Sequence, residues 1–296
     1  MGAKKKTLKS LRSGRPPTAT ASRSMSRKAS RTLINSHHQL EKKRRQAIAE
    51  GDADAEKSLS AEIATLGGLK HYQRASLQGQ SLERGGDTSK VLLEWLNVRT
   101  MKDIKHCPRM LEVGSLSTRN ACSLSGFFDM VHIDLNSQEP GIQQQDFMER
   151  PLPESDADRF DLISLSLVLN FVPDAALRGQ MLLRTLSFLR RNLGEPGDGQ
   201  AAWPGPLLFL VLPRSCLDNS RYMSASRFTE LLETLGYKVM QEKSSQKLWY
   251  SLWKLVQAQP PSTVKFTKRE VNPGRSRNNF SITLDHPPEP TTKARR

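Results

Sequence analysis

Between residues 110 and 256, short apolar runs alternate with longer stretches in which apolar residues recur at helical spacing. Four runs are apolar and of strand length, at residues 110–113, 130–135, 160–165 and 207–212. Residues 174–193 place leucines on one helical face, and residues 224–235 read as a second helix that Gly236 ends. This alternation predicts a parallel, doubly wound α/β sheet with helices on its faces.

The two ends of this alternating region follow different patterns. Residues 237–242 and 248–256 predict an antiparallel hairpin that closes the sheet, and residues 87–89 can cap a helix that reaches residue 101. Residues 35–66 read as helical with a break at residues 51–52. Both termini are rich in Pro, Ser, Lys and Arg, which predicts disordered basic tails. We therefore expect four parts: a tail at 1–34, a helical extension and loop at 35–86, a Rossmann-like domain at 87–256, and a basic tail at 257–296.

The positive charge of the chain is concentrated at its ends. The formal net charge is +15 over 296 residues, of which residues 1–50 carry +12 and residues 257–296 carry +5, so the intervening part is close to neutral at −2. A near-neutral body with basic ends favours a polyanion as partner, because lysine and arginine neutralise phosphates and release counterions. A nuclear import signal explains the same charge runs and does not exclude contact with RNA.

Three other classes of protein are disfavoured by composition. No apolar run approaches the roughly 20 residues of a membrane span, so we expect no membrane association. The three cysteines, Cys107, Cys122 and Cys216, are scattered and form no Cys/His cluster, so we expect neither a metal site nor a disulfide framework. Unpaired cysteines fit a reducing intracellular compartment.

The first candidate for ligand binding is the end of the strand at residues 110–113. Gly114 follows this strand directly, and a glycine there lets a ligand approach the backbone closely. Ligands of open α/β sheets bind outside the carboxyl ends of the strands, so we expect Gly114 to pass under the methionine part of a cofactor. Glu112 either holds this loop or accommodates positive groups of the cofactor. A glycine that only forms a turn explains the same pattern.

The second candidate is Asp134, which lies 20 residues after Gly114 at the end of the next predicted strand. A carboxylate at this spacing can accept hydrogen bonds from both ribose hydroxyls of a nucleoside cofactor, although an aspartate that forms a turn is the alternative. The loop Gly114-Ser115-Leu116-Ser117 lacks the second and third glycines of the dinucleotide fingerprint. This disfavours an NAD enzyme and suits S-adenosylmethionine, which has no phosphate to seat.

Two further strand ends carry polar residues. Asp146 can accept the adenine amino group of the cofactor, and a surface aspartate is an equally good interpretation. Ser164 and Ser166, with Asn170 and Phe171 after them, lie where methyltransferases place groups that face the substrate. No Asn/Asp-Pro-Pro-aromatic motif occurs there, so methylation of the exocyclic amino group of adenine is disfavoured. No residue is identified as catalytic.

Several longer segments of the chain then carry a resemblance to a known family. They are Tyr72-Gln73-Arg74-Ala75-Ser76, Arg84-Gly85-Gly86-Asp87-Thr88-Ser89-Lys90, Leu111-Glu112-Val113-Gly114, Ile133-Asp134-Leu135-Asn136 and Val168-Leu169-Asn170-Phe171-Val172-Pro173. In this order they resemble the fungal 25S rRNA adenine-N1 methyltransferase family over residues 72–256.

The resemblance implies a class I methyltransferase fold, with a mostly parallel seven-stranded sheet and a C-terminal antiparallel hairpin. It implies S-adenosylmethionine as cofactor, bound at Gly114 and Asp134, and methylation of one adenine in large-subunit rRNA or a pre-ribosome in the nucleolus. We expect a monomer. An animal relative resembles these segments but senses S-adenosylmethionine for nutrient signalling, so a non-catalytic sensor or ribosome-assembly factor is the alternative function.

Overall fold

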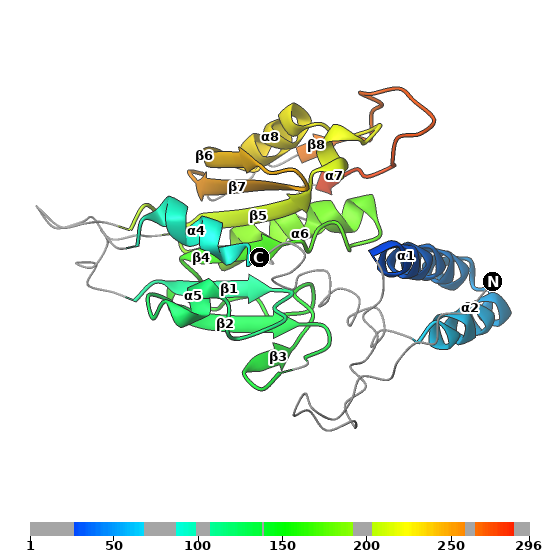
Figure 1. Ribbon diagram of the computed structural model, residues 1–296, viewed down its shortest axis with the longest axis horizontal. Helices are drawn as coiled ribbons and strands as arrows, with labels where there is room; N and C mark the ends of the chain where they lie inside the picture. The colour runs from blue at the N-terminus through cyan, green and yellow to red at the C-terminus, as the bar shows by residue number, and fades with distance from the viewer. Residues whose placement is uncertain are drawn as a thin grey trace, which may run out of the picture.

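A seven-stranded sheet forms the centre of the computed structural model, which describes residues 27–67, 87–98, 107–137, 139–191, 203–257 and 264–286. The strand order is β3-β2-β1-β4-β5-β7-β6, in which β7 alone runs antiparallel to its neighbours (Figure 1). The strands are β1 (Arg109–Val113), β2 (Asp129–Asp134), β3 (Ile142–Gln144), β4 (Leu162–Ser166), β5 (Leu207–Pro213), β6 (Tyr237–Ser244) and β7 (Leu248–Leu255). This confirms the predicted mostly parallel sheet with a C-terminal antiparallel hairpin.

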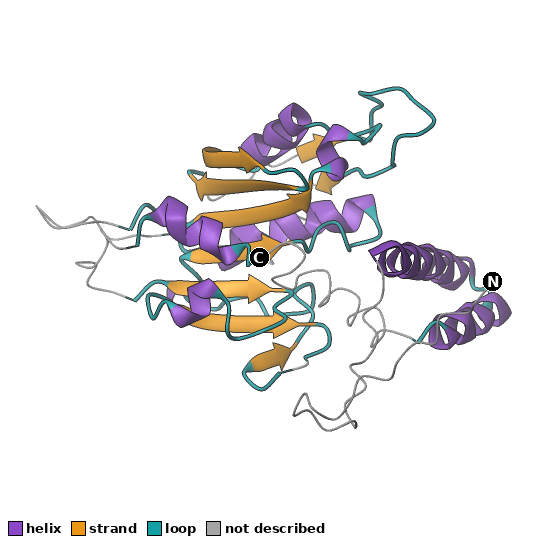
Figure 2. Cartoon of the chain, in the orientation of Figure 1, coloured by secondary structure: helices purple, strands orange, loops and turns teal. Residues whose placement is uncertain are grey.

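Helices cover both faces of the sheet, because alternate side chains of each strand point to opposite faces. On one face Leu208, Leu210 and Leu212 of β5 join a core with α6 (Ala175–Phe188) and α8 (Ala225–Thr234). On the other face Leu207 and Phe209 pack with α4 (Ser89–Leu96) and α5 (Ala121–Leu124). Figure 2 shows these helices in purple around the orange strands. Burial on both faces explains why β5 is apolar throughout.

The strand order places a topological switch point between β1 and β4. From β1 the chain continues to β2 and β3 on one side, whereas β4 and β5 lie on the other side. The connections after β1 and β4 therefore leave in opposite directions at the carboxyl ends of these two strands. This is the position at which open α/β sheets bind their ligands.

The N-terminal helices differ in extent from the prediction. Helix α1 (Arg27–Glu50) begins inside the stretch predicted as a tail, and the predicted boundary at residue 34 is therefore too late. Helix α2 (Ala53–Thr65) packs against α1, and the side chain of Asp52 accepts a hydrogen bond from the backbone N–H of Ala55 at its start. Residues 1–26 and 68–86 lie outside the described residues.

The predicted C-terminal tail is wrong over residues 264–286. Strands β8 (Val264–Phe266) and β9 (Leu284–His286) pair with each other, and Phe266, Phe280, Ile282 and Leu284 are buried in the core beside α6. Phe280, Ile282 and Leu284 are spaced two residues apart within a Lys-, Arg- and Pro-rich stretch, so the polar average composition of this stretch hides a buried face. Residues 287–296 lie outside the described residues.

The remaining elements are short. Helix α7 (Ser215–Asp218) follows β5, and a single 3-10 turn spans Asp156–Asp158. Helix α5 has four residues where the sequence predicts a helix or turn over 120–128, and α6 ends at Phe188 rather than at residue 193. None of the described helices is long and apolar enough to cross a membrane.

Candidate cofactor site at the carboxyl ends of the strands

The turn after β1 brings the predicted residues Gly114 and Asp134 to neighbouring positions. The backbone N–H groups of Gly114 and Ser115 both donate to the carbonyl of Ile133, at 2.8 and 3.0 Å. Ile133 directly precedes Asp134, so the loop after β1 is tied to the end of β2. The φ of Gly114 is 73°, a left-handed conformation that glycine adopts without steric cost.

Gly114 also lies against the chain that follows β4. A Cβ atom built at Gly114 would be 2.9 Å from Cγ2 of Val168, which is closer than carbon atoms approach in real contacts. Both the backbone conformation and the space therefore require glycine here. A side chain at this position would project against the chain that follows β4.

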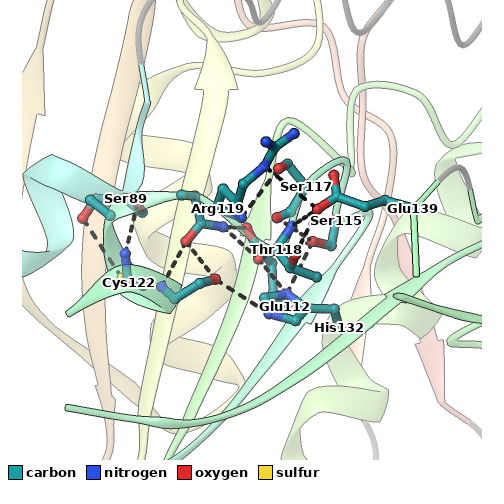
Figure 3. A network of polar contacts seen from close by, with 12 residues as sticks. Ser89, Glu112, Ser115, Ser117, Thr118, Arg119, Cys122, His132 and Glu139 are labelled. Atoms are coloured by element: carbon teal, nitrogen blue, oxygen red, sulfur yellow. Dashed lines mark hydrogen bonds and ion pairs between the residues drawn. The ribbon is translucent and has the colours of Figure 1, made fainter. Parts of the chain in front are cut away.

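Glu112 holds the loop after β1 through three different donors (Figure 3). The side-chain amide of Asn120 donates to both carboxylate oxygens at 2.9 and 2.8 Å, and the Ser115 hydroxyl donates to Oε2 at 3.1 Å. Nδ1 of the buried His132 lies 2.9 Å from the same oxygen. Of the two roles predicted for Glu112, these contacts match that of fixing the loop.

The partner His132 was missed by the sequence reasoning. Glu112 and His132 are register neighbours on the parallel strands β1 and β2, just as Val113 is opposite Ile133. The ring also lies 3.1 Å from the Ser115 hydroxyl and 3.3 Å from the Ser123 hydroxyl. The detectable signal is one acidic and one imidazole side chain at matching positions of two strands whose other interior residues are apolar.

Asp134 lies at the last position of β2 and is half-buried. Burial raises the pKa of its carboxyl group, and the hydrogen bond from the backbone N–H of Asn136 (2.8 Å) acts in the opposite direction. A carboxylate that is partly withdrawn from water binds neutral hydroxyl donors well, because the exchange of water for ligand costs less. This environment fits the predicted contact with ribose hydroxyls.

Asp146 follows β3 in a turn next to the end of β2. The backbone N–H of Gln145 donates to the carbonyl of Asp134 at 2.8 Å, which places Asp146 one residue beyond that contact. Oδ1 of Asp146 accepts from the backbone N–H of Met148 at 2.8 Å, so the side chain also shapes its own turn. Both predicted interpretations of Asp146 remain compatible with this position.

Asp87 and Ser89, in the stretch predicted to cap a helix, also fix the helix that follows the loop. Asp87 accepts hydrogen bonds from the backbone N–H and the hydroxyl of Ser89 and from the backbone N–H of Ala121. The Ser89 hydroxyl accepts in turn from the backbone N–H of Cys122. The start of α4 is thereby joined to the start of α5, at the same edge of the sheet as Gly114.

The segment after β4 contains two unusual features. Leu167 has a φ of 59°, which is strained for a residue with a branched side chain. Oδ1 of Asn170 is buried and has no hydrogen-bond partner among the described residues. A buried acceptor without a donor is costly, and a donor from a bound molecule would offset this cost. The hydroxyls of Thr88 and Ser166, 2.8 Å apart, connect it to the start of α4.

Neither buried cysteine is suited to act as a nucleophile. Burial raises the pKa of Cys216 to about 12, and burial together with the nearby carboxylate of Glu112 raises the pKa of Cys122 further. Reactive cysteines require the thiolate form. Within the part of the chain that the structure describes, no group of three or more His, Cys, Asp or Glu side chains is placed to hold a metal ion.

Comparisons with known proteins identify the family of this chain. The family model described as Bmt2, 25S rRNA (adenine(2142)-N(1))-methyltransferase, matches residues 57–282. A Saccharomyces cerevisiae relative, named 25S rRNA (adenine(2142)-N(1))-methyltransferase, is 44% identical over 227 residues, covering 75% of this chain and 62% of the relative. The chain thus spans less than two thirds of that relative. A Schizosaccharomyces pombe relative, named 25S rRNA adenine-N(1) methyltransferase, is 38% identical over 257 residues, covering 84% of this chain and 89% of the relative.

Among solved structures, magnesium protoporphyrin IX methyltransferase from Synechocystis PCC 6803 with bound SAM is 10% identical, with a TM-score of 0.39, and covers 56% of this chain and 77% of its own. The 16S rRNA methylase RmtB is 13% identical, with a TM-score of 0.36, and covers 76% and 74%. The fold of this chain is assigned from the order of its strands. Its family is assigned from the sequence matches. The chain belongs to the Bmt2 family of 25S rRNA (adenine(2142)-N(1))-methyltransferases.

Proposed function

We propose that this chain is an S-adenosylmethionine-dependent methyltransferase that modifies N1 of an adenine in 25S rRNA. The observation that carries the proposal is its family membership, since the matched residues 57–282 include the complete strand-end site. The positions of Gly114 at the switch point of the sheet and of Asp134 at the end of the neighbouring strand β2 support it independently, because this is where a nucleoside cofactor would lie.

Three residues of the site would contact the cofactor, and a fourth would support them. The backbone at Gly114 would pass under its methionine part, and Asp134 would accept hydrogen bonds from the two ribose hydroxyls. Asp146 would accept from the adenine amino group of the cofactor. Glu112 would not contact the cofactor directly, because its carboxylate already accepts hydrogen bonds from the loop. Its role would be to hold this loop in place.

The proposed reaction requires alignment more than proton transfer. Bound S-adenosylmethionine supplies a sulfonium methyl group, which the in-plane lone pair of adenine N1 takes in an in-line displacement that moves the positive charge from sulfur to the purine. Neutral adenine carries no proton on N1, so no general base is needed. The contribution of the protein is to hold the two reactants in line and to exclude water.

We propose that Asn170 orients the target base. Its unpartnered Oδ1 lies after β4, two residues from Val168, which contacts the Gly114 turn. The exocyclic amino group of adenine is adjacent to N1 and is a hydrogen-bond donor. A bond from that amino group to Asn170 would satisfy the buried oxygen and direct N1 toward the methyl group. The target must be unpaired or flipped, because N1 lies on the pairing edge.

We also propose that the protein acts in the nucleolus, on large-subunit rRNA or a pre-ribosome, and as a monomer. The support for this location and this RNA partner is the substrate named for its relatives and the net charge of +12 in residues 1–50. Fluorescent fusions of the full chain and of a chain lacking residues 1–26 test the location. Retention of both in the cytoplasm contradicts it.

The activity is tested by methyl transfer from labelled S-adenosylmethionine to large-subunit rRNA isolated from cells that lack the protein. We expect label in 1-methyladenosine with the wild-type chain and none with Asp134→Ala. If no label appears on rRNA or on pre-ribosomal particles while calorimetry shows cofactor binding, the enzymatic proposal is wrong. The non-catalytic sensor or assembly-factor alternative then applies.

A further inference from the structure

Residues 267–279 form a projecting basic segment, called here the arm, that is fixed to the domain at both ends. At its start, the guanidinium of Arg227 lies 4.1 Å from the ring centre of the buried Phe266 and donates to the carbonyl of Thr267 at 2.6 Å. At its end, the guanidinium of Arg178 lies 4.5 Å from the ring centre of the buried Phe280. Two cation–π contacts therefore set where the arm leaves and rejoins the core.

The middle of the arm is held by backbone hydrogen bonds to the segment after α7. The N–H groups of Val271 and Asn272 donate to the carbonyl of Arg221 at 2.8 and 3.1 Å. The N–H of Arg221 donates to the carbonyl of Asn278 at 3.0 Å, and the N–H of Asn278 donates to that of Asn219 at 2.9 Å. The path of the arm is thus defined by the protein itself.

The arm lies at the same edge of the sheet as the cofactor site. The segment to which it is bonded follows α7, and α7 follows the carboxyl end of β5, the strand next to β4. In Figure 2 the arm is the long teal loop at the end of the sheet toward which β1 and β2 point. An RNA strand that delivers a base to this edge would meet the arm on the way.

The arm gathers positive charge without acidic partners. Its 13 residues include four cations and one acid, Glu270. Lys268, Arg269 and Arg275 are exposed, and among the described residues no salt bridge involves them or Arg277.

Neighbouring cations add to this concentration of charge. Lys268 Nζ and Arg221 Cζ lie 4.2 and 5.8 Å from the ring centre of the same Tyr222. Burial and then the nearby Arg269 lower the pKa of Arg227. Clustered like charges destabilise a folded domain, so an external polyanion is favoured to offset them.

We propose that the arm, together with Arg221 and Tyr222, docks the phosphate backbone of the RNA whose base enters the site. This inference rests on the proposed function for the identity of the RNA, and it adds a surface that fixes where the strand crosses the domain. Phosphate contacts of this kind set position and orientation rather than base preference. The arm therefore governs binding of the RNA and leaves the bond-forming step to the strand-end site.

The test compares two double variants that each remove one lysine and one arginine. K268Q/R275Q removes two of the four cations of the arm. The control variant R191Q/K238Q neutralises two exposed residues at the opposite edge of the sheet. Arg191 follows the end of α6. Lys238 pairs with Lys254, which in turn pairs with the first residue of β5. The affinity for an unmodified 25S rRNA transcript is measured by filter binding over a range of salt concentrations, and S-adenosylmethionine affinity is measured by calorimetry.

For K268Q/R275Q we expect the slope of log affinity against log salt to fall by about 1.4–1.8, because each lost phosphate contact removes roughly 0.7–0.9. We expect R191Q/K238Q to keep the wild-type slope, and both variants to keep the cofactor affinity. In methyl-transfer assays K268Q/R275Q should raise KM for RNA and leave kcat at saturating RNA unchanged. Equal slopes for the two variants overturn the inference.

The failure of the arm and the failure of the proposed function give different results. If wild-type protein methylates the RNA and the two variants have equal slopes of log affinity against log salt, the proposal for the arm is wrong and the proposed activity is retained. If wild-type protein transfers no methyl group, but RNA binding depends less on salt in K268Q/R275Q alone, the arm binds RNA and the proposed activity is wrong. A K268Q/R275Q variant that loses cofactor affinity as well would assign the arm a structural role and overturn the inference.

Discussion

Replacing Gly114 with alanine tests how strictly the turn after β1 is determined by its surroundings. Its φ of 73° places an alanine in the left-handed region, which costs about 1–2 kcal/mol. The added Cβ would also be 2.9 Å from Cγ2 of Val168, so one of the two segments must move. Together we expect the free energy of unfolding to fall by about 2–3 kcal/mol, which corresponds to a loss of roughly 5–10 °C in Tm.

Gly126→Ala is the matched control for the backbone part of this effect. Gly126 has a φ of 66°, but no atom lies within 4 Å of the position of its Cβ. We expect Gly126→Ala to lose only the backbone contribution of about 1–2 kcal/mol. The difference between the two variants then measures crowding. Adding Val168→Ala to Gly114→Ala should recover that difference, because it removes the methyl group that Cβ meets.

The assays are thermal unfolding followed by circular dichroism and calorimetric titration with S-adenosylmethionine. We expect Gly114→Ala to weaken cofactor binding as well as stability, whereas Gly126→Ala should weaken stability alone. Equal Tm values for the two alanine variants would refute the crowding argument. Unchanged cofactor affinity in Gly114→Ala would refute the position of the cofactor over this turn.

Three more substitutions probe the rest of the site. Asp134→Asn should weaken S-adenosylmethionine binding about 10- to 100-fold, through loss of charge-assisted bonds. Because burial raises the pKa of Asp134, the charged form is disfavoured on folding, so the ligand-free Asn variant should have a higher Tm at neutral pH. That gain should shrink as pH falls through the raised pKa, and a lower Tm at pH 7 would contradict this reasoning. Asn170→Ala should lower kcat without changing cofactor affinity by calorimetry, and an unchanged kcat would remove Asn170 from base orientation. Glu112→Ala should cost about 3 kcal/mol in chemical denaturation, because His132 and the loop donors lose their shared acceptor; a loss below about 1 kcal/mol would show that these contacts are dispensable.

The sheet and the centre of the candidate site could be predicted from local features of the sequence. Strand and helix periodicities depend only on residues a few positions apart, so the order of elements and the closing hairpin are readable without tertiary information. The same holds for Gly114 at a strand end and for Asp134 20 residues later. Two consecutive parallel strands of similar length bring residues at this spacing to one edge.

The tertiary structure alone decided which distant residues share a site. His132 becomes the partner of Glu112 only through the register of β1 and β2, and Asn170 becomes a buried acceptor only where the chain after β4 passes the Gly114 turn. The arm shows the same limit, since its composition predicts a solvated tail while Phe266 and Phe280 bury its ends against helices far away in sequence. The periodicity of apolar residues shows which face of a helix or strand is apolar. Which surface covers this face depends on the packing of the whole chain.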